Sequence, residues 1–147
     1  MLADKETVIR LIPQQPPMVM VHGLVEHNDR YTRTLFVVEE GNIFLEDGCL
    51  SEAGLIENMA QSAALRTGWI SAGNKNEEQD FVPRIGVIGA IKNFELFRKP
   101  EVNSSLQTTI ELQTEFGSAT MVSAIVKQDD ELLARAELKI FLTETED

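Results

Sequence analysis

One segment in the middle of the chain, residues 51–68, constrains the fold more than any other. It reads SEAGLIENMAQSAALRTG, contains no proline, and is flanked on both sides by segments rich in Val, Ile, Thr and Phe. Ser51 is a suitable N-cap, Glu52 suits the positive end of a helix, and Gly68 suits its C-terminal end. We therefore predict one long helix in a chain whose remaining apolar segments are typical of strands.

Six strands are predicted around this helix. Residues 18–28 and 31–39 read as a hairpin, and four further strands follow at 84–97, 105–115, 118–128 and 132–142. One helix against six strands indicates an α+β fold, in which an antiparallel sheet of about six strands wraps around one long central helix. The polar stretch 71–80 is expected to be an exposed loop, and residues 1–147 a single domain.

Composition excludes several functional classes. The chain has 13 Lys and Arg against 24 Asp and Glu, a net charge of −11, and no basic cluster of the kind that phosphate backbones require. No run approaches the roughly 18 apolar residues of a membrane span, so we expect neither nucleic acid nor membrane as a partner. The single cysteine, Cys49, cannot form an internal disulfide, and the acidic start MLADKETVIR is not a secretory signal, which favours a cytoplasmic protein.

Glu57 is the only ionisable residue within positions 53–65 of the predicted helix. At 100° per residue, Gly54, Asn58 and Gln61 lie on its side within an arc of about 100°. A surface helix of an acidic protein usually carries several charges, so both faces of this helix are expected to be covered. A covered carboxylate needs hydrogen-bond partners or a proton, which makes Glu57 a functional candidate. The alternative is that the polar stripe faces solvent or a dimer partner.

The histidines are weaker candidates. His22 lies in the first predicted strand, where a histidine is usually packed and hydrogen-bonded, and His27 lies at a turn beside acidic residues. The two histidines lie apart in the predicted fold and have no cysteine partner, so their spacing does not predict a metal site. No sequence motif indicates a cofactor. Cys49 is expected to be a small, buried or half-buried residue.

Three stretches of the chain resemble the 3-hydroxyacyl-acyl carrier protein dehydratases. IPQQPPMVMV at 12–21 is similar to the LPHRPPMLLVD-type opening of that family, and GLIENMAQ at 54–61 is similar to its helix motif G-(V/I)-x-E-x-M-A-Q. IKNFELFRKP at 91–100 looks like its strand motif I-x-N-x-x-F-x-x-P. The resemblance spans nearly the whole chain, implies the hotdog fold, and is nearest to the dehydratase-like proteins of aryl polyene and flexirubin-type pigment clusters.

This resemblance implies elimination of water from a 3-hydroxyacyl thioester carried by acyl carrier protein or coenzyme A. In that family a histidine removes the α-proton, a helix carboxyl protonates the departing hydroxyl, and the acyl chain lies in a tunnel between two subunits. Glu57 matches the catalytic carboxyl, Gly54 matches the glycine near the thioester, and Gln61 matches a glutamine with a structural part. Together with Leu55 and Asn58, Gly54 and Gln61 are the candidate substrate-binding residues.

The family's catalytic histidine has no counterpart in this chain. The loop 42–50, NIFLEDGCL, contains no histidine, Gln14 replaces the histidine of the opening motif, and His22 takes the place of a strand Asp. General-base catalysis contributes about 10²–10⁴-fold, so a lone homodimer without the base would be crippled.

Three hypotheses stay open. In the first, the chain is one subunit of a heterodimer whose paralogous hotdog partner supplies the histidine. In the second, it is a catalytically inactive hotdog protein, a homodimer or a heterodimer, that binds acyl chains or acyl carrier protein. In the third, it is a thioesterase-like enzyme in which Glu57 orients or activates water. The basic pair Arg98-Lys99 is either a docking site for an acidic carrier protein or a solvated pair of charges.

Overall fold

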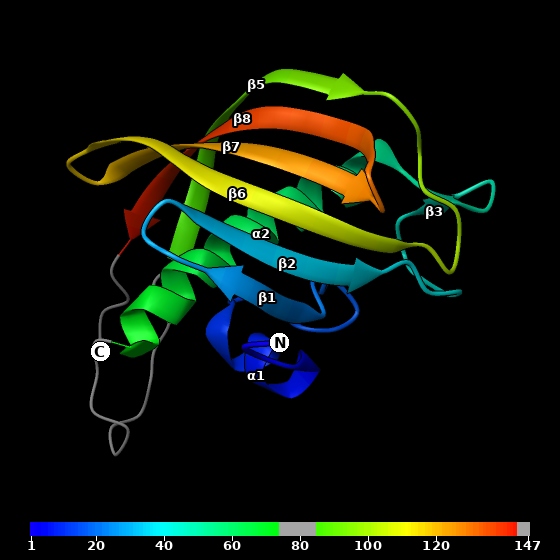
Figure 1. Cartoon of the computed structure of the whole chain (residues 1–147), viewed down its shortest axis with the longest axis horizontal. Coiled ribbons are helices and arrows are strands. Elements are labelled where there is room, and N and C mark those ends of the chain that lie inside the picture. Colours follow the sequence, from blue (N-terminus) through cyan, green and yellow to red (C-terminus); the bar gives the residue numbers. More distant parts are fainter. Residues whose placement is uncertain (74–84, 144–147) are drawn as a thin grey trace.

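The structure is a computed structural model that describes residues 1–73 and 85–143. Within these two ranges the elements follow in the order α1 (Lys5–Leu11), β1 (Gly23–His27), β2 (Tyr31–Val37), β3 (Leu45–Glu46), β4 (Cys49–Leu50), α2 (Glu52–Gly73), β5 (Ile85–Leu96), β6 (Ser105–Phe116), β7 (Ala119–Gln128) and β8 (Glu131–Thr143). Figure 1 shows the sheet curving around α2, with α1 beside it near the N-terminus.

Six strands form one antiparallel sheet in the order β1-β2-β6-β7-β8-β5. The two-residue connections β6–β7 and β7–β8 contain Gly117 at φ 58° and Asp129 at φ 55°, because tight hairpin turns need left-handed residues. The predicted sheet of about six strands around one long helix is therefore confirmed. Strands β1 and β5 are its two edges.

The helix α2 packs against the sheet through one apolar side. Leu55, Met59 and Ala63 recur at intervals of four residues on this side and belong to the main core, together with side chains of the sheet such as Leu106, Ile110, Val122, Ala124 and Leu138. The side chains of Asn58, Gln61 and Leu65, on another side of α2, are buried as well. The expectation that both faces of the helix are covered is confirmed, and it explains why so few charges occur along it.

The helix α1 was not predicted from the sequence. Asp4 caps it by accepting a hydrogen bond from the N–H of Thr7 at 3.0 Å. It packs against α2 at Gly68, where a Cβ atom would lie only 2.1 Å from the carbonyl oxygen of Leu11. Gly68 is therefore needed for the close approach of two helices, and the prediction that it ends the long helix is wrong, because α2 continues to Gly73.

Two other boundaries differ from the predictions. The first strand begins at Gly23, so residues 18–22 of the predicted hairpin lie outside it. Ser71–Gly73 of the predicted loop 71–80 form the last turn of α2, and the rest of that loop lies outside the described residues.

Candidate active site

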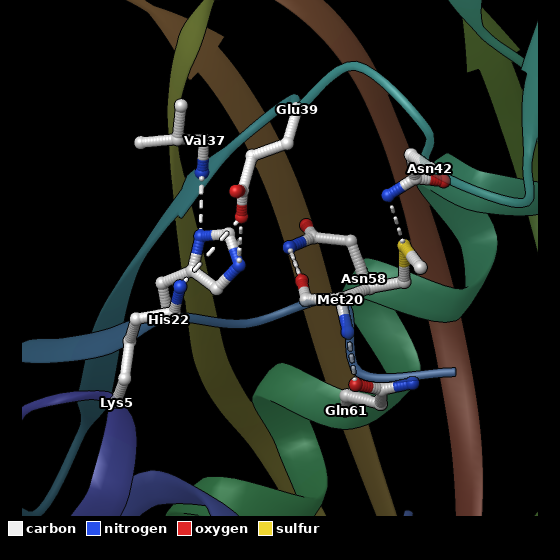
Figure 2. A network of polar contacts seen from close by, with 8 residues as sticks. All are labelled: Lys5, Met20, His22, Val37, Glu39, Asn42, Asn58 and Gln61. Carbon is white, nitrogen blue, oxygen red and sulfur yellow. Dashed lines mark hydrogen bonds and ion pairs between the residues drawn. The ribbon is translucent and has the colours of Figure 1, made fainter. Parts of the chain in front are cut away.

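The segment Met18–Met20, called the strap below, passes over α2 and is fixed to it by two buried amides (Figure 2). Gln61 Oε1 accepts the N–H of Met20 at 2.6 Å, and Gln61 Nε2 donates to the carbonyl of Met18 at 2.7 Å. Asn58 Nδ2 donates to the carbonyl of Met20 at 2.7 Å, and its Oδ1 accepts the hydroxyl of Thr108 at 2.5 Å. These side chains provide the backbone partners that a neighbouring strand would otherwise supply.

Glu57 lies one turn before Gln61 and is half-buried. Its Oε1 accepts a hydrogen bond from Gln61 Nε2 at 2.9 Å. Among the described residues its second oxygen, Oε2, has no hydrogen-bond partner. Only one of the two carboxyl oxygens of Glu57 therefore has a described hydrogen-bond partner.

Gly54 and Leu55 occupy the first turn of α2. The hydroxyl of Ser51 accepts the N–H of Gly54 at 3.3 Å, which confirms Ser51 as the N-cap. A Cβ atom at position 54 would lie 2.6 Å from Leu50 Cδ1 and 2.9 Å from Phe44 Cβ, so the loop before α2 packs closely on a glycine. Leu55 is fully buried and points toward the sheet. Substrate contact by Gly54, Leu55, Asn58 and Gln61 stays a prediction.

His22 has polar contacts of its own with Val37 and Glu39 (Figure 2). Its Nδ1 accepts the N–H of Val37 at 3.1 Å, and its Nε2 lies 3.2 Å from a carboxylate oxygen of Glu39. Burial and the nearby Lys5 ammonium lower the pKa of His22, and the Glu39 carboxylate acts in the opposite direction. Because Nδ1 is an acceptor, the neutral ring carries its proton on Nε2, and His22 is a poor base in this arrangement.

The described cavities do not include Glu57 in their walls. One of about 210 Å³ lies between the C-terminal half of α2 and the sheet, and is lined mainly by apolar side chains together with Arg66, Thr67 and Glu115. A second, of about 180 Å³, lies beside His22 and the two prolines Pro16 and Pro17.

Arg66 is a buried polar residue that the sequence analysis did not single out. Its guanidinium donates to the carbonyls of Asn28 and Asp29 at 3.0 and 2.7 Å and to the hydroxyl of Thr32 at 2.8 Å. Burial lowers the pKa of Arg66, and the acidic side chains of Glu115 and Asp29 act in the opposite direction. This residue joins the second half of α2 to the β1–β2 turn.

The basic pair Arg98-Lys99 is partly engaged. Arg98 makes two hydrogen bonds to the carboxylate of Glu131, at 2.7 and 3.0 Å, and a third to Gln128 at 2.9 Å. These contacts tie the segment after β5 to the β7–β8 hairpin and leave Arg98 less available to a carrier protein.

Two further classes of site are absent from the described residues. No three His, Cys, Asp or Glu side chains in residues 1–73 and 85–143 gather closely enough to hold a metal ion. None of the helices in those ranges is both long and apolar enough to cross a bilayer.

A curved antiparallel sheet around one long helix is the hotdog fold. Residues 6–147 match the model of the ApeP-like family, described as ApeP dehydratase. The chain therefore belongs to the ApeP-like family. A search of curated proteins finds no match.

Solved structures share the same fold at low sequence identity. The dehydratase heterocomplex ApeI:P from Xenorhabdus doucetiae matches with a TM-score of 0.81 and 19% identity, over 94% of this chain and 91% of that chain. The PaaI protein of E. coli matches with a TM-score of 0.63 and 10% identity, over 81% of each chain. A hypothetical thioesterase from Streptococcus pneumoniae, solved with coenzyme A, matches with a TM-score of 0.64 and 10% identity, over 84% and 87%.

Proposed function

We propose that this chain is the carboxyl-bearing subunit of a heterodimeric 3-hydroxyacyl-thioester dehydratase. In this reaction a base removes the proton on the carbon next to the thioester, and the bond between carbon 3 and its hydroxyl breaks. Glu57 gives its proton to the departing hydroxyl, so the products are water and a 2,3-unsaturated acyl thioester. The carrier is an acyl carrier protein or coenzyme A.

The observation that carries this proposal is the environment of Glu57. It is the only acid within positions 53–65, it is half-buried, and one of its oxygens is held by Gln61 while the other has no partner among the described residues. A general acid needs one oxygen that can meet the leaving group, in a place where water is limited. Membership of the ApeP-like dehydratase family supports the same role.

The base must come from outside the chain. His22 uses Nδ1 to accept the N–H of Val37 and directs Nε2 toward Glu39, and the loop before α2 contains no histidine. The structural relative from Xenorhabdus doucetiae is a dehydratase heterocomplex, which supports a paralogous hotdog subunit as the source of the histidine.

Strand β5 supports the position of this partner. It is an edge of the sheet, 12 residues long, and no described strand pairs with its outer side. Ile91 is 40% exposed on this strand, and Phe97, which follows it, is 52% exposed. A long edge strand with exposed apolar side chains is a surface on which another sheet can pair. We infer that the partner adds its sheet there and closes the acyl crevice beside α2.

We place the reaction in the cytosol, in the synthesis of conjugated acyl chains. Successive eliminations of water leave successive double bonds, and the sequence resembles the dehydratase-like proteins of aryl polyene clusters. The single Cys49, with no second cysteine to pair with, is compatible with a reducing compartment.

The test is reconstitution with a paralogous hotdog subunit that contains the missing histidine. We expect the lone chain to show little turnover of 3-hydroxyacyl thioesters, the pair to show rapid turnover, and Glu57→Gln to abolish it. Rapid turnover by the lone chain that is lost in Glu57→Gln would reject the need for a partner.

Two other functions are outcomes of the same experiment. If no paralogous subunit restores turnover but the chain still binds acyl thioesters or acyl carrier protein, it is an inactive binding protein. If the chain releases free acid from a thioester in a Glu57-dependent way, it is a thioesterase, an activity named for one of the neighbours that share the fold.

A further inference from the structure

The cavity of about 210 Å³ between the second half of α2 and the inner face of the sheet lies apart from Glu57. Arg66, in its wall, follows Glu57 by nine residues, which at about 100° per residue places the two side chains on opposite sides of the helix. Strands β6, β7 and β8 form the other wall, with the apolar side chains of Ile110, Val122 and Ile140. The proposed dehydration does not use this space.

Arg66 is a buried cation without a counterion in the wall of this cavity. It is only 8% exposed, and its Nη atoms donate to the carbonyls of Asn28 and Asp29 and to the hydroxyl of Thr32. These acceptors are neutral, and among the described residues no carboxylate oxygen lies within 4.0 Å of the guanidinium. A guanidinium stays protonated in proteins, so a positive charge is buried here without an ion pair.

The guanidinium also has hydrogens left to donate. Three of its five N–H hydrogens are used in the bonds to Asn28, Asp29 and Thr32. The hydrogen on Nε and one on Nη2 have no acceptor among the described residues. Two neighbouring N–H groups of an arginine match the two oxygens of a carboxylate. A carboxylate would therefore supply both missing acceptors and the missing negative charge, whereas an uncharged hydroxyl would supply one acceptor and no charge.

The apolar walls define the rest of the ligand. A dry cavity of about 150 Å³ lined by aliphatic and aromatic side chains accommodates benzene. A cavity of about 210 Å³ is thus large enough for a ring or chain of about six carbons with a carboxyl group attached. We propose that this cavity binds a small monocarboxylate, with its carboxylate on Arg66 and its apolar body between α2 and the sheet.

Glu115 gives the proposed site a second electrostatic property. Its side chain is exposed and lines the same cavity, and its charge acts on Arg66 without an ion pair between the two among the described residues. An exposed carboxylate repels a bound anion only weakly, because water and salt screen it. Replacing Glu115 by Gln should therefore tighten the binding of a carboxylate, and it would weaken the binding of a cation.

The experiment is a calorimetric titration of the full chain, alone or in the reconstituted pair, with benzoate, hexanoate and the uncharged benzyl alcohol. We expect one site for the carboxylates, at least about tenfold tighter than for benzyl alcohol, because hydrogen bonds between charged groups are stronger than neutral ones. Glu115→Gln should tighten this binding by about two- to five-fold. Glu57→Gln should leave it unchanged, because Glu57 lies on the other side of α2.

Three variants locate the binding. Thr67→Leu adds volume to the wall of the cavity and keeps Arg66, so it should weaken the carboxylates by at least about tenfold. Arg66→Met should abolish their binding, and Thr67→Leu provides the test if Arg66→Met does not fold. Arg33→Met is the matched control, because Arg33 pairs with Glu26 and does not line this cavity. Its affinity for benzoate should equal that of the unaltered chain.

No saturable binding of either carboxylate would overturn the proposal and indicate a cavity filled by water only. Equal affinity for benzyl alcohol, weaker binding in Glu115→Gln or unchanged binding in Thr67→Leu would overturn it as well. Loss of binding in Glu57→Gln would move the carboxylate to the proposed active site and reject a separate one. The role of Glu57 as the acid is tested by turnover, so either proposal can fail while the other stands.

Discussion

The two halves of α2 attach to the same β1–β2 region in different ways. In the first half, two neutral amides, Asn58 and Gln61, bind the strap that leads into β1, and a half-buried carboxyl lies beside them. In the second half, one charged side chain, Arg66, binds the carbonyls of the turn that leads out of β1. Both attachments satisfy buried polar groups, but only the first lies beside a carboxyl oxygen without a described partner. The proposed acid therefore belongs to one half of the helix, whereas both halves serve as anchors.

The largest expected effect is on activity. Glu57→Gln keeps the shape of the side chain and an acceptor for Gln61, but it removes the transferable proton. We expect kcat of the reconstituted pair to fall by about 10²–10⁴-fold. The free energy of unfolding, measured by urea denaturation, should change by less than about 0.5 kcal/mol, as for surface substitutions. A large loss of stability would show that Glu57, like Asn58 and Gln61, helps to hold the strap on α2.

Asn58→Leu tests the anchor on the strap. The substitution leaves the carbonyl of Met20 and the hydroxyl of Thr108 without their partner, and Met20 and Thr108 are fully buried. Because buried unpaired groups cost about 1–3 kcal/mol each, we expect a loss of about 2–4 kcal/mol in the free energy of unfolding. Urea denaturation measures this loss. A smaller loss of unfolding free energy than in Arg66→Met would contradict the expectation that the anchor on the strap is the stronger of the two.

Arg66→Met tests the anchor on the turn. The carbonyls that Arg66 binds belong to Asn28 and Asp29, which are exposed residues, so water can replace part of what is lost. Met keeps most of the apolar stem. We expect a smaller loss than for Asn58→Leu, about 1–3 kcal/mol, by the same denaturation measurement. Unchanged stability would mean that the buried guanidinium contributes nothing to folding.

The smallest expected effect comes from His22, whose pKa burial lowers in the folded chain. The folded state then binds fewer protons than the unfolded state, whose histidine titrates near pH 6.5. The stabilising contribution is therefore complete above about pH 6.5 and is lost as pH falls through the lowered folded-state pKa. Two other charged side chains, Lys5 and Glu39, lie near the His22 ring. Asp4 and Glu6 line a surface hollow that also contains His22.

Comparison with His22→Gln isolates this contribution. We expect the unfolding free energy of the unaltered chain to decline more steeply between pH 7 and pH 5 than that of the variant. Parallel curves for the two proteins would show that His22 does not titrate differently in the folded chain.

The elements with strong local patterns could be predicted from the sequence. Side-chain periodicity predicted the long helix and the six strands, and the signals at a helix start predicted Ser51 as the N-cap of α2. These patterns act over only a few residues. The seven-residue helix α1 could not, because a helix this short is stabilised by packing on α2 and not by its own propensity.

The site was only partly predictable, since its contacts join distant segments. The motif around Glu57 marked the candidate acid, but the partners of Gln61 and Asn58 on the strap lie about 40 residues away. MVMVH at 18–22 has the composition of a strand, but the backbone groups of Met18 and Met20 bond to side chains of α2 instead of a neighbouring strand. Arg66 was not singled out, because nothing in the sequence near it indicates that the β1–β2 turn covers it.

The outer side of β5, with which no described strand pairs, also bears on how the protein is best produced. An edge strand of 12 residues invites pairing with any extended chain, including another copy of itself. Synthesis in excess over a companion would then yield self-association or insoluble material, and balanced co-expression would keep the edge strand covered. If the proposed partner covers this strand, we expect the two subunits to be produced in matched amounts.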